Sequence, residues 1–406
     1  MRVTFKKSRA HGTLRVPPSK SMAHRLLLAA ALCEGVCTVH GVPECEDVAA
    51  TLDCMSALGL KFTKEGDRVT VYGKGKNALR PEGALPCRES GSTLRFLIPL
   101  AMLSDTEVTF RGAERLFARP LSVYEKIAEE RALLFRREKD ALTVKGPLAP
   151  GDFPVVGNIS SQFISGLLFA LPLLGGDSRI RITTAIESRS YIEMTLRALA
   201  AFGVRAVWQD EHTLFVPGGQ TYDARDVCVE GDYSGAAFPD ALNLFGSEVT
   251  LTGLSPDSVQ GDSAYRRYFP MLAAGVPTLY IGDCPDLGPI LFAVAAAKNG
   301  GVFDGTRRLK IKESDRAAAM AEELKKFGTS VSVYPDTVVV YPTAFHAPSL
   351  PLEGHNDHRI VMALSILLTL TGGSIRGAEA VKKSYPAFFD DLASLGILWE
   401  AEDENR

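Results

Sequence analysis

The strongest constraint on the fold is a pattern that occurs six times, a polar or small helix start followed by a long apolar helix. The six starts lie at Ser19, Ser90, Ser160, Ser234, Leu287 and Asp357. Four of the five intervals between them measure 70 to 74 residues, and the interval from Ser234 to Leu287 measures 53 residues. Because self-similarity at a fixed period marks a repeated structural unit, we expect six related units. The apolar helix of each unit is expected to be buried.

The segments between these helices follow a common order. Each apolar helix precedes a short alternating strand such as TEVTFRG, and an amphipathic helix ending at glycine follows, as in YIEMTLRALAAFG. Two further short strands come after several of these helices. The period changes from 3.6 to 2 at the glycine, which acts as a helix stop. The sequence therefore predicts an α/β fold of six βαβαββ units in two groups of three, whereas an ordinary doubly wound sheet would show no such period.

Length, charge and cysteine content narrow the class of protein. A chain of 406 residues favours two domains over one. The formal net charge of −3 does not indicate a general nucleic-acid or membrane surface, so positive charge for anion binding has to be concentrated locally. Seven cysteines lie scattered without metal-ligand spacing, which indicates reduced thiols in a cytosolic protein. No leader segment is expected before the strand-like RVTF, and the apolar helices are too short and interrupted to span a bilayer.

The first helix start, in PPSKSMAHR, predicts an anion site. The two prolines keep the backbone extended, and Ser19 offers an N-cap hydroxyl. Lys20, Ser21 and Arg25 lie in the first two turns. Free backbone N–H groups, the positive end of the helix dipole and two cations would then converge on a phosphate or carboxylate. The alternative is an ordinary capped helix with two solvated cations.

Three further motifs of the first half contain small or hydroxylated residues at helix starts. In ESGSTLR, Gly91 permits close approach of the backbone to a ligand. Arg119 precedes a proline at a loop-to-helix joint. The GNISSQF and ESRSYIE motifs supply uncharged polar groups that suit phosphate oxygens, and each motif alone could also be a simple helix cap. These groups belong to Ser160, Ser161, Gln162, Ser188 and Tyr191.

The second half contains charged residues at the corresponding positions. Asp286 precedes a buried helix, where a carboxylate can be an N-cap or a general base. Lys312, Glu313 and Arg316 crowd into one turn, a pattern that solvated faces also show. The DHR motif, with His358 and Arg359, opens an apolar helix. Charged groups there are costly without partners. Lys383 precedes a Tyr-Pro helix start, which is otherwise ordinary.

Taken together, these motifs resemble the EPSP synthase family, the 3-phosphoshikimate 1-carboxyvinyltransferases. PPSKSMAHR, ESGSTLR, ARP, GNISSQF, ESRSYIE, KESDR, NDHR and KKSYPAFF occur in the family's order, and the resemblance covers essentially the whole chain. It implies two domains of three βαβαββ units each, an inside-out α/β barrel, with the active site in the cleft between the domains. Residues 13–226 would form one domain, and residues 1–12 with 227–406 the other.

The resemblance also implies a reaction. The enolpyruvyl group of phosphoenolpyruvate would move to the 5-hydroxyl of shikimate 3-phosphate, with release of phosphate through a tetrahedral intermediate. This step belongs to the shikimate pathway of aromatic amino acid biosynthesis. No metal or other cofactor is implied. The partners would be these two small anions, without nucleic acid or membrane, and we expect a monomer in the cytoplasm.

The family's site residues carry over to matching positions. Shikimate 3-phosphate would be bound by Lys20, Ser21, Arg25, Ser160, Ser161, Gln162, Ser188, Tyr191, Asp286 and Lys312. Phosphoenolpyruvate would be bound by Lys20, Gly91, Arg119, Gln162, Arg316, His358, Arg359 and Lys383. Asp286 would be the base for the 5-hydroxyl, Glu313 the acid that protonates the methylene carbon, and Lys20 would touch both substrates. Arg308 and Glu89 stand where the family often has asparagine.

Two alternatives remain at this point. The sister enolpyruvyl transferase that acts on UDP-N-acetylglucosamine shares the fold, but it normally carries a reactive cysteine in the loop matching GAERLFARP, and asparagine where Ser21 stands. A non-catalytic anion-binding module, or an RNA-terminal-phosphate protein of related repeats, would have a more basic surface. It would also lack the paired carboxylates of Asp286 and Glu313.

Overall fold

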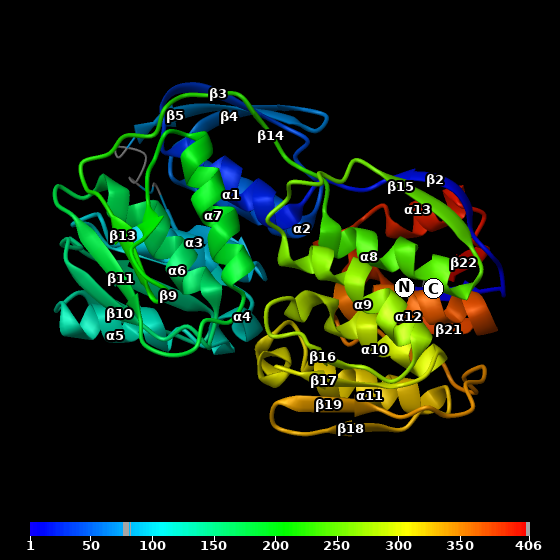
Figure 1. Cartoon of the computed structure of the whole chain (residues 1–406). Helices are drawn as coiled ribbons and strands as arrows, with labels where there is room; N and C mark the ends of the chain where they lie inside the picture. The colour runs from blue at the N-terminus through cyan, green and yellow to red at the C-terminus, as the bar shows by residue number, and fades with distance from the viewer. Residues whose placement is uncertain (76–80, 82, 403–406) are drawn as a thin grey trace. The chain divides into compact units, whose positions relative to one another are not determined.

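The computed structural model describes residues 1–75, 81 and 83–402, and the chain forms two compact units (Figure 1). The inserted unit comprises Pro18–Glu230. The terminal unit comprises Met1–Pro17 and Gly231–Arg406 and therefore carries both chain ends. The domain boundaries predicted at residues 13 and 226 lie within five residues of these divisions.

The inserted unit contains three four-stranded sheets of one topology, in which two parallel strands are followed by two antiparallel ones. The first has the order β14 (Val227–Cys228), β3 (Glu34–His40), β5 (Arg68–Lys74) and β4 (Lys61–Glu65). The second has the order β6 (Leu85–Arg88), β7 (Val108–Gly112), β9 (Ala141–Lys145) and β8 (Leu134–Arg137). The third has the order β10 (Asp152–Val155), β11 (Ser178–Ile182), β13 (Thr213–Val216) and β12 (Val207–Trp208).

Apolar helices form the core of the inserted unit. Its helices are α1 (Lys20–Ala31), α2 (Glu46–Ala57), α3 (Gly91–Ala101), α4 (Glu114–Ala118), α5 (Ser122–Glu130), α6 (Ser161–Ala170), the 3-10 turn η2 (Leu171–Leu173) and α7 (Arg189–Ala201). The predicted apolar helices α1, α3 and α6 are buried along most of their length, and α3 packs against α6. Burial of these apolar side chains is the main stabilising contribution to the unit.

The terminal unit contains two sheets of the same topology and one shorter sheet. One has the order β16 (Thr278–Tyr280), β17 (Gly301–Asp304), β19 (Thr337–Val340) and β18 (Val331–Val333). Another has the order β20 (Leu352–Glu353), β21 (Gly373–Arg376), β1 (Arg2–Phe5) and β22 (Trp399–Glu402). The third pairs β15 (Glu248–Thr252) with β2 (His11–Arg15) in parallel. Strands from the two ends of the chain therefore share sheets.

The helices of the terminal unit follow the same plan. They are α8 (Tyr233–Ala241), η3 (Leu242–Phe245), η4 (Gly261–Ala264), α9 (Tyr265–Ala274), η5 (Pro285–Leu287), α10 (Gly288–Ala297), η6 (Arg307–Ile311), α11 (Arg316–Lys326), α12 (His358–Thr371), η7 (Ala378–Lys383) and α13 (Phe388–Ser394). Helices α10 and α12 are almost wholly buried and pack against each other. Figure 1 shows strands on the outside of these central helices.

One repeat is shorter than the sequence pattern predicts. Among the described residues, β15 pairs with β2 only, and the second strand pair of this unit is absent. The reason is chain length, since only residues 275–277 separate α9 from β16. The mixed α/β fold of repeated units is confirmed, although no sheet of the described strands closes into a barrel.

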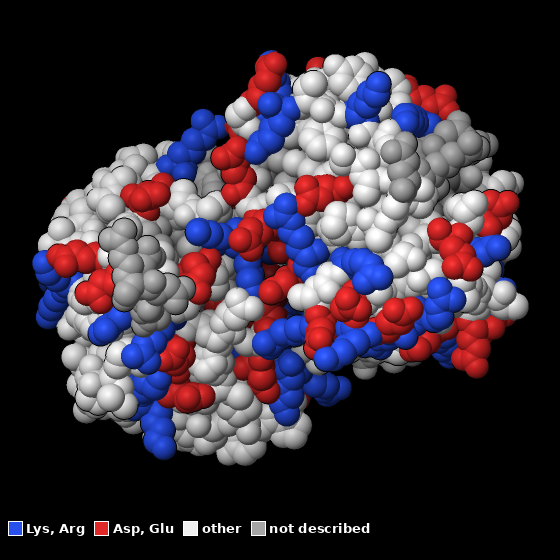
Figure 2. Space-filling view, turned by 180° about the vertical axis from the view of Figure 1, so that it is seen from behind, with Lys and Arg blue, Asp and Glu red and all other residues white. Residues whose placement is uncertain are grey.

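Charge and hydropathy of the described residues show two further features. Figure 2 shows Lys and Arg side chains mixed with Asp and Glu side chains across the face in view, without a continuous basic surface. Over the described part of the chain, no helix has both the length and the apolar character needed to cross a membrane.

Candidate active site

Three apolar helices of the inserted unit begin at serine N-caps, as predicted. The hydroxyls of Ser19, Ser90 and Ser160 accept backbone N–H groups at 3.3–3.4 Å. A capping hydroxyl satisfies one of the free N–H groups of a helix start and fixes where the helix begins. The residues that follow each cap are therefore held at the positive end of a helix dipole.

The Lys20 ammonium forms an ion pair that the sequence did not indicate. Its Nζ lies 2.8 Å from Oδ2 of Asp47, and both side chains are mostly buried. Asp47 lies in the first turn of α2, where an acidic residue is ordinarily explained by the helix dipole. Nothing in the sequence around Asp47 therefore indicated Lys20 as its partner. The pairing fixes the ammonium next to the start of α1.

Arg25 joins the starts of α1 and α7. Its guanidinium is buried and donates to Thr195 Oγ1 at 2.9 Å, to the Ser21 carbonyl at 2.6 Å and to the Tyr191 carbonyl at 3.0 Å. The same group lies 5.1 Å from the ring centroid of Phe96. Burial lowers the pKa of Arg25 to about 10, so the guanidinium stays charged at neutral pH. The structure thus brings together Ser21, Arg25 and Tyr191.

Gly91 lies against two arginines. A Cβ atom at this position would come within 2.7 Å of Arg119 Nη1 and 3.0 Å of Arg95 Nη1. Arg95 donates to Gln162 Oε1 at 2.9 Å, and Gln162 Nε2 donates to Ser92 Oγ at 2.9 Å. The Gln162 amide is therefore fixed in orientation. Arg95 lies one turn inside this apolar helix and was not among the predicted site residues.

Ser188 has an unusual backbone conformation. It precedes α7 with φ of 59° and ψ of 46°, in the left-handed region that residues other than glycine rarely adopt. Its carbonyl accepts the Tyr191 N–H at 3.1 Å. Strained residues of this kind persist only where their surroundings hold them, and they concentrate at functional sites. Ser188 and Ser161 are both buried.

In the terminal unit, the predicted carboxylates and cations form one cluster. Asp286 Oδ1 accepts from Lys312 Nζ at 3.0 Å and from Arg316 Nη1 at 2.8 Å. Its Oδ2 lies 3.6 Å from Arg359 Nη2. Burial lowers the pKa of Lys312 despite the opposing influence of Asp286. The cluster therefore holds a carboxylate among three cations.

Arg316 is the centre of this cluster. Its side chain is 1% exposed and contacts Asp286, Glu313 and Asp357. Nη2 donates to Glu313 Oε2 at 2.7 Å, and Nε donates to Asp357 Oδ2 at 2.9 Å. Burial acts to lower the pKa of Arg316, but the three carboxylates raise it well above its usual value. Ser314 also donates to Asp357, at 2.9 Å.

Further predicted site residues of the terminal unit lie at or near the start of α12. Asp357 is fully buried and caps the helix by accepting the Arg359 N–H at 2.9 Å. His358 and Arg359 are also buried. Burial acts to lower the pKa of Arg359, but Asp286 and Asp232 raise it above its usual value. Lys383 Nζ donates to the Asn356 carbonyl at 2.8 Å.

This arrangement can support acid–base chemistry on an anion. Two carboxylates, Asp286 and Glu313, are bound to different nitrogens of the Arg316 guanidinium. A carboxylate can accept a proton from an alcohol, and a carboxylic acid can donate one. Fixed cations stabilise the negative charge of a phosphoryl or carboxylate substrate. These features agree with a transferase acting on charged small molecules.

Comparison with known proteins identifies the family. The sequence pattern described as EPSP synthase (3-phosphoshikimate 1-carboxyvinyltransferase) matches residues 5–270 and 271–392. The chain belongs to the EPSP synthase family. A 3-phosphoshikimate 1-carboxyvinyltransferase of Clostridium beijerinckii is 38% identical and covers 96% of this chain and 96% of the relative. The one from Clostridium kluyveri is also 38% identical, over 97% of both chains.

Solved structures show the fold of the EPSP synthase family. EPSP synthase from Acinetobacter baumannii matches with a TM-score of 0.82 and 22% identity, over 99% of this chain and 100% of that chain. The enolpyruvyl transferase NikO from Streptomyces tendae matches with a TM-score of 0.80 and 13% identity, over 98% of both chains. The repeated α/β architecture is therefore shared with enolpyruvyl transferases.

Proposed function

We propose that the chain is a 3-phosphoshikimate 1-carboxyvinyltransferase. It transfers the enolpyruvyl group of phosphoenolpyruvate to the 5-hydroxyl of shikimate 3-phosphate, giving 5-enolpyruvylshikimate 3-phosphate and phosphate. The observation that carries the proposal is the buried Arg316, which contacts both Asp286 and Glu313 in a chain matched along its length by relatives of that name. These are the acid–base groups that the reaction requires.

The shikimate 3-phosphate site is assigned largely to the inserted unit. Lys20, Ser21 and Arg25 would bind the shikimate carboxylate region, and the hydroxyls of Ser160, Ser161 and Ser188 the 3-phosphate. Gln162 and Tyr191 would lie beside the ring. The fixed Gln162 amide and the capped helix starts support this assignment. Asp286 and Lys312 of the terminal unit would reach the 5-hydroxyl.

Phosphoenolpyruvate is assigned to cations of both units. In the inserted unit these are Lys20 and Arg119, with Gly91 and Gln162 beside them. In the terminal unit they are Arg316, Arg359 and Lys383, with His358 as a lining residue. Each charge-assisted contact of this kind contributes about 1.5–3 kcal/mol.

The chemistry proceeds by addition and then elimination. Asp286 takes the proton of the 5-hydroxyl while the hydroxyl oxygen bonds to C2 of phosphoenolpyruvate. Glu313 protonates C3 of phosphoenolpyruvate. This gives a tetrahedral intermediate that still carries the phosphate at C2. The Glu313 carboxylate then takes a proton back from C3 as the C2–O bond to phosphate breaks, which restores the double bond and releases phosphate. The cations stabilise the phosphate as it leaves.

The proposed activity is tested by phosphate release from phosphoenolpyruvate with EDTA present. One reaction contains shikimate 3-phosphate, and a second contains UDP-N-acetylglucosamine. Release only with the shikimate ester is the expected result and would also show that the reaction needs no added metal. Release only with the nucleotide sugar would support the sister enolpyruvyl transferase. A folded protein that binds the ester without release in either reaction would be an anion-binding module.

The predicted substrates, oligomeric state and location of the protein also belong to this proposal. Small anionic substrates agree with the cations present among the site residues of each unit. A monomeric state and a cytoplasmic location stay predictions.

Gly91→Ala is expected to raise the KM for phosphoenolpyruvate roughly tenfold to a hundredfold, through loss of about one charge-assisted contact. The added methyl group would displace Arg119, whose Nη1 lies 2.7 Å from the Cβ position. The matched control is Gly175→Ala in the same unit, where no heavy atom lies within 4 Å of the new Cβ. Both variants are measured by phosphate release at saturating shikimate 3-phosphate. An unchanged KM in Gly91→Ala would remove Arg119 from the phosphoenolpyruvate site.

A further inference from the structure

The loop between β20 and α12 contacts cations of the candidate site in the terminal unit. The Asn356 carbonyl accepts Lys383 Nζ at 2.8 Å. Asp357, the next residue, accepts Arg316 Nε at 2.9 Å. The conformation of this loop therefore sets the positions of two cations, Lys383 and Arg316, assigned above to phosphoenolpyruvate.

The loop has a strained backbone. His355 and Asn356 have φ of 50° and 52°, so two consecutive residues other than glycine occupy the left-handed region. Such a conformation is costly and persists only where the surroundings hold it. The Gly354 N–H donates to the Arg376 carbonyl at 2.9 Å, which anchors the start of the loop. A second anchor is needed for His355.

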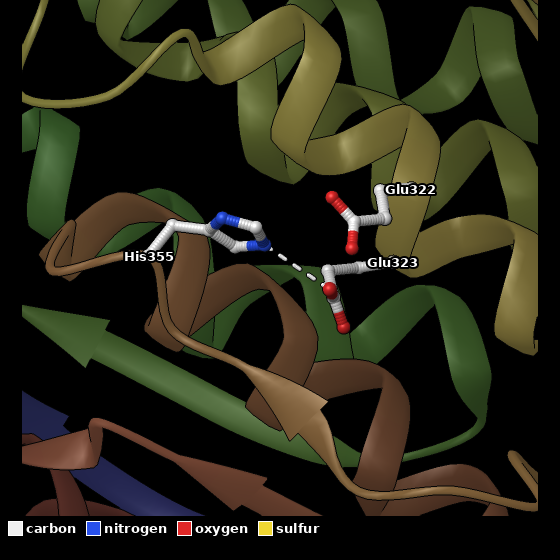
Figure 3. Close-up of side chains that lie close together, drawn as sticks. All are labelled: Glu322, Glu323 and His355. Atoms are coloured by element: carbon white, nitrogen blue, oxygen red, sulfur yellow. Dashed lines mark hydrogen bonds and ion pairs between the residues drawn. The ribbon is translucent and has the colours of Figure 1, made fainter.

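Glu323 provides that second anchor. It lies on α11, two turns after Arg316, and its side chain is fully buried. Its carboxylate accepts from His355 Nε2 at 3.1 Å (Figure 3). It also accepts from the Glu353 backbone N–H at 3.0 Å. Lys326 Nζ donates to both carboxylate oxygens, at 3.0 and 2.8 Å. A buried carboxylate is stable only with such partners.

We propose that Glu323 is a positioning residue for phosphoenolpyruvate binding, an inference that rests on the function proposed above. Glu323 ties α11, which carries Arg316, to the loop that carries Asn356 and Asp357. It touches neither substrate. Without its bonds to His355 and to the β20 backbone, the strained loop relaxes and both cations lose their fixed positions.

A metal site is the other reading of this cluster. The ligand atoms of Glu322, Glu323 and His355 all lie within 4.8 Å of one another. However, Glu323 already holds the Lys326 ammonium at both oxygens, and a metal ion would have to displace that cation. Glu322 lies on the exposed side of the helix. The hydrogen bonds therefore favour positioning over metal binding.

His355 gives the positioning role a pH dependence. The groups that face it are Glu323, Glu322 and Lys326, all on α11. The hydrogen bond to Glu323 raises the pKa of His355 above its usual value of 6.5, although burial opposes the shift. The imidazolium–carboxylate bond is therefore fully present at acidic pH. It weakens as the pH rises through the raised pKa, because the imidazole becomes neutral.

The test compares Glu323→Gln with Glu322→Gln, which removes the same charge one residue away on the exposed side. The KM for each substrate is measured by phosphate release. Glu323→Gln is expected to raise the KM for phosphoenolpyruvate about tenfold while the KM for shikimate 3-phosphate changes less than about twofold. Glu322→Gln is expected to change both values by less than about twofold.

His355→Asn supplies a second variant, because asparagine tolerates the left-handed region but is too short to reach Glu323. It is expected to raise the same KM, and the double variant is expected to show no larger effect than either single one. The ratio of its KM to that of the unchanged protein is expected to fall as the pH rises through the raised His355 pKa. Titration of phosphoenolpyruvate itself cancels in this ratio.

Three outcomes would overturn the inference. These are a KM for phosphoenolpyruvate within twofold of the unchanged protein in both variants, equal rises in both KM values, or additive effects in the double variant. If Glu323→Gln does not fold, His355→Asn decides alone. An unchanged protein that releases no phosphate would remove the proposed function and this inference together, whereas an active protein with insensitive variants would remove only this inference.

Discussion

Asp286→Asn is expected to lower kcat for phosphate release by about 10²–10⁴. The amide cannot accept the proton of the 5-hydroxyl, so the oxygen has to attack phosphoenolpyruvate as a neutral alcohol. The side chain that is replaced also accepts hydrogen bonds from Lys312 at 3.0 Å and Arg316 at 2.8 Å. The amide oxygen can still accept one of these bonds, and therefore the KM values are expected to change less than kcat.

The measurement is phosphate release at saturating concentrations of both substrates. Asp390→Asn is the matched control, because Asp390 is exposed on α13 of the same unit and loses the same charge. Thermal unfolding of both variants shows whether the fold persists. A kcat for Asp286→Asn within threefold of the unchanged protein would exclude Asp286 as the base. A loss confined to KM would make it a binding residue.

Local features of the fold could be predicted from the sequence because their causes are local. A capping hydroxyl and the apolar run after it lie within one segment, so helix starts at Ser19, Ser90, Ser160 and Asp357 were identified correctly. The missing strand pair of the short repeat was not predicted, although the interval of 53 residues from Ser234 to Leu287 marks that repeat as short. Only residues 275–277 separate α9 from β16, which leaves no chain for a second strand pair.

Contacts between distant segments could not be predicted in the same way. Arg316 and Asp357 are 41 residues apart, and Arg25 and Thr195 are 170 residues apart. The sequence indicated which residue types would gather at helix starts, but not which cation would pair with which carboxylate. Glu323 is the clearest example, because in sequence it is an ordinary acidic residue of an amphipathic helix. Its burial and its bond to His355 appear only in the folded structure.

Arg316→Met is expected to lower the free energy of unfolding by about 3–5 kcal/mol, since it removes one partner of a buried ion-pair network. Arg316 is 1% exposed, and its loss leaves Asp286, Glu313 and Asp357 close together without their shared cation. Arg307→Met is the matched control. Arg307 pairs with Asp336 in the same unit but is 59% exposed, so a change of about 0–1 kcal/mol is expected.

Urea unfolding of both variants measures this difference. The loss of unfolding free energy in Arg316→Met is expected to be smaller in an Asp357→Asn background, where one of the buried charges is already gone. An equal loss in both backgrounds would mean that packing of the arginine stem, rather than charge, stabilises this region.

Arg316→Lys separates stability from substrate binding. The ammonium retains the charge but cannot make the three directed contacts of the planar guanidinium. The fold is therefore expected to survive, while kcat/KM for phosphoenolpyruvate falls roughly tenfold to a hundredfold. If Arg316→Lys were fully active, a point charge would suffice at this position. The hydrogen bonds to Glu313 and Asp357 would then have only a structural role.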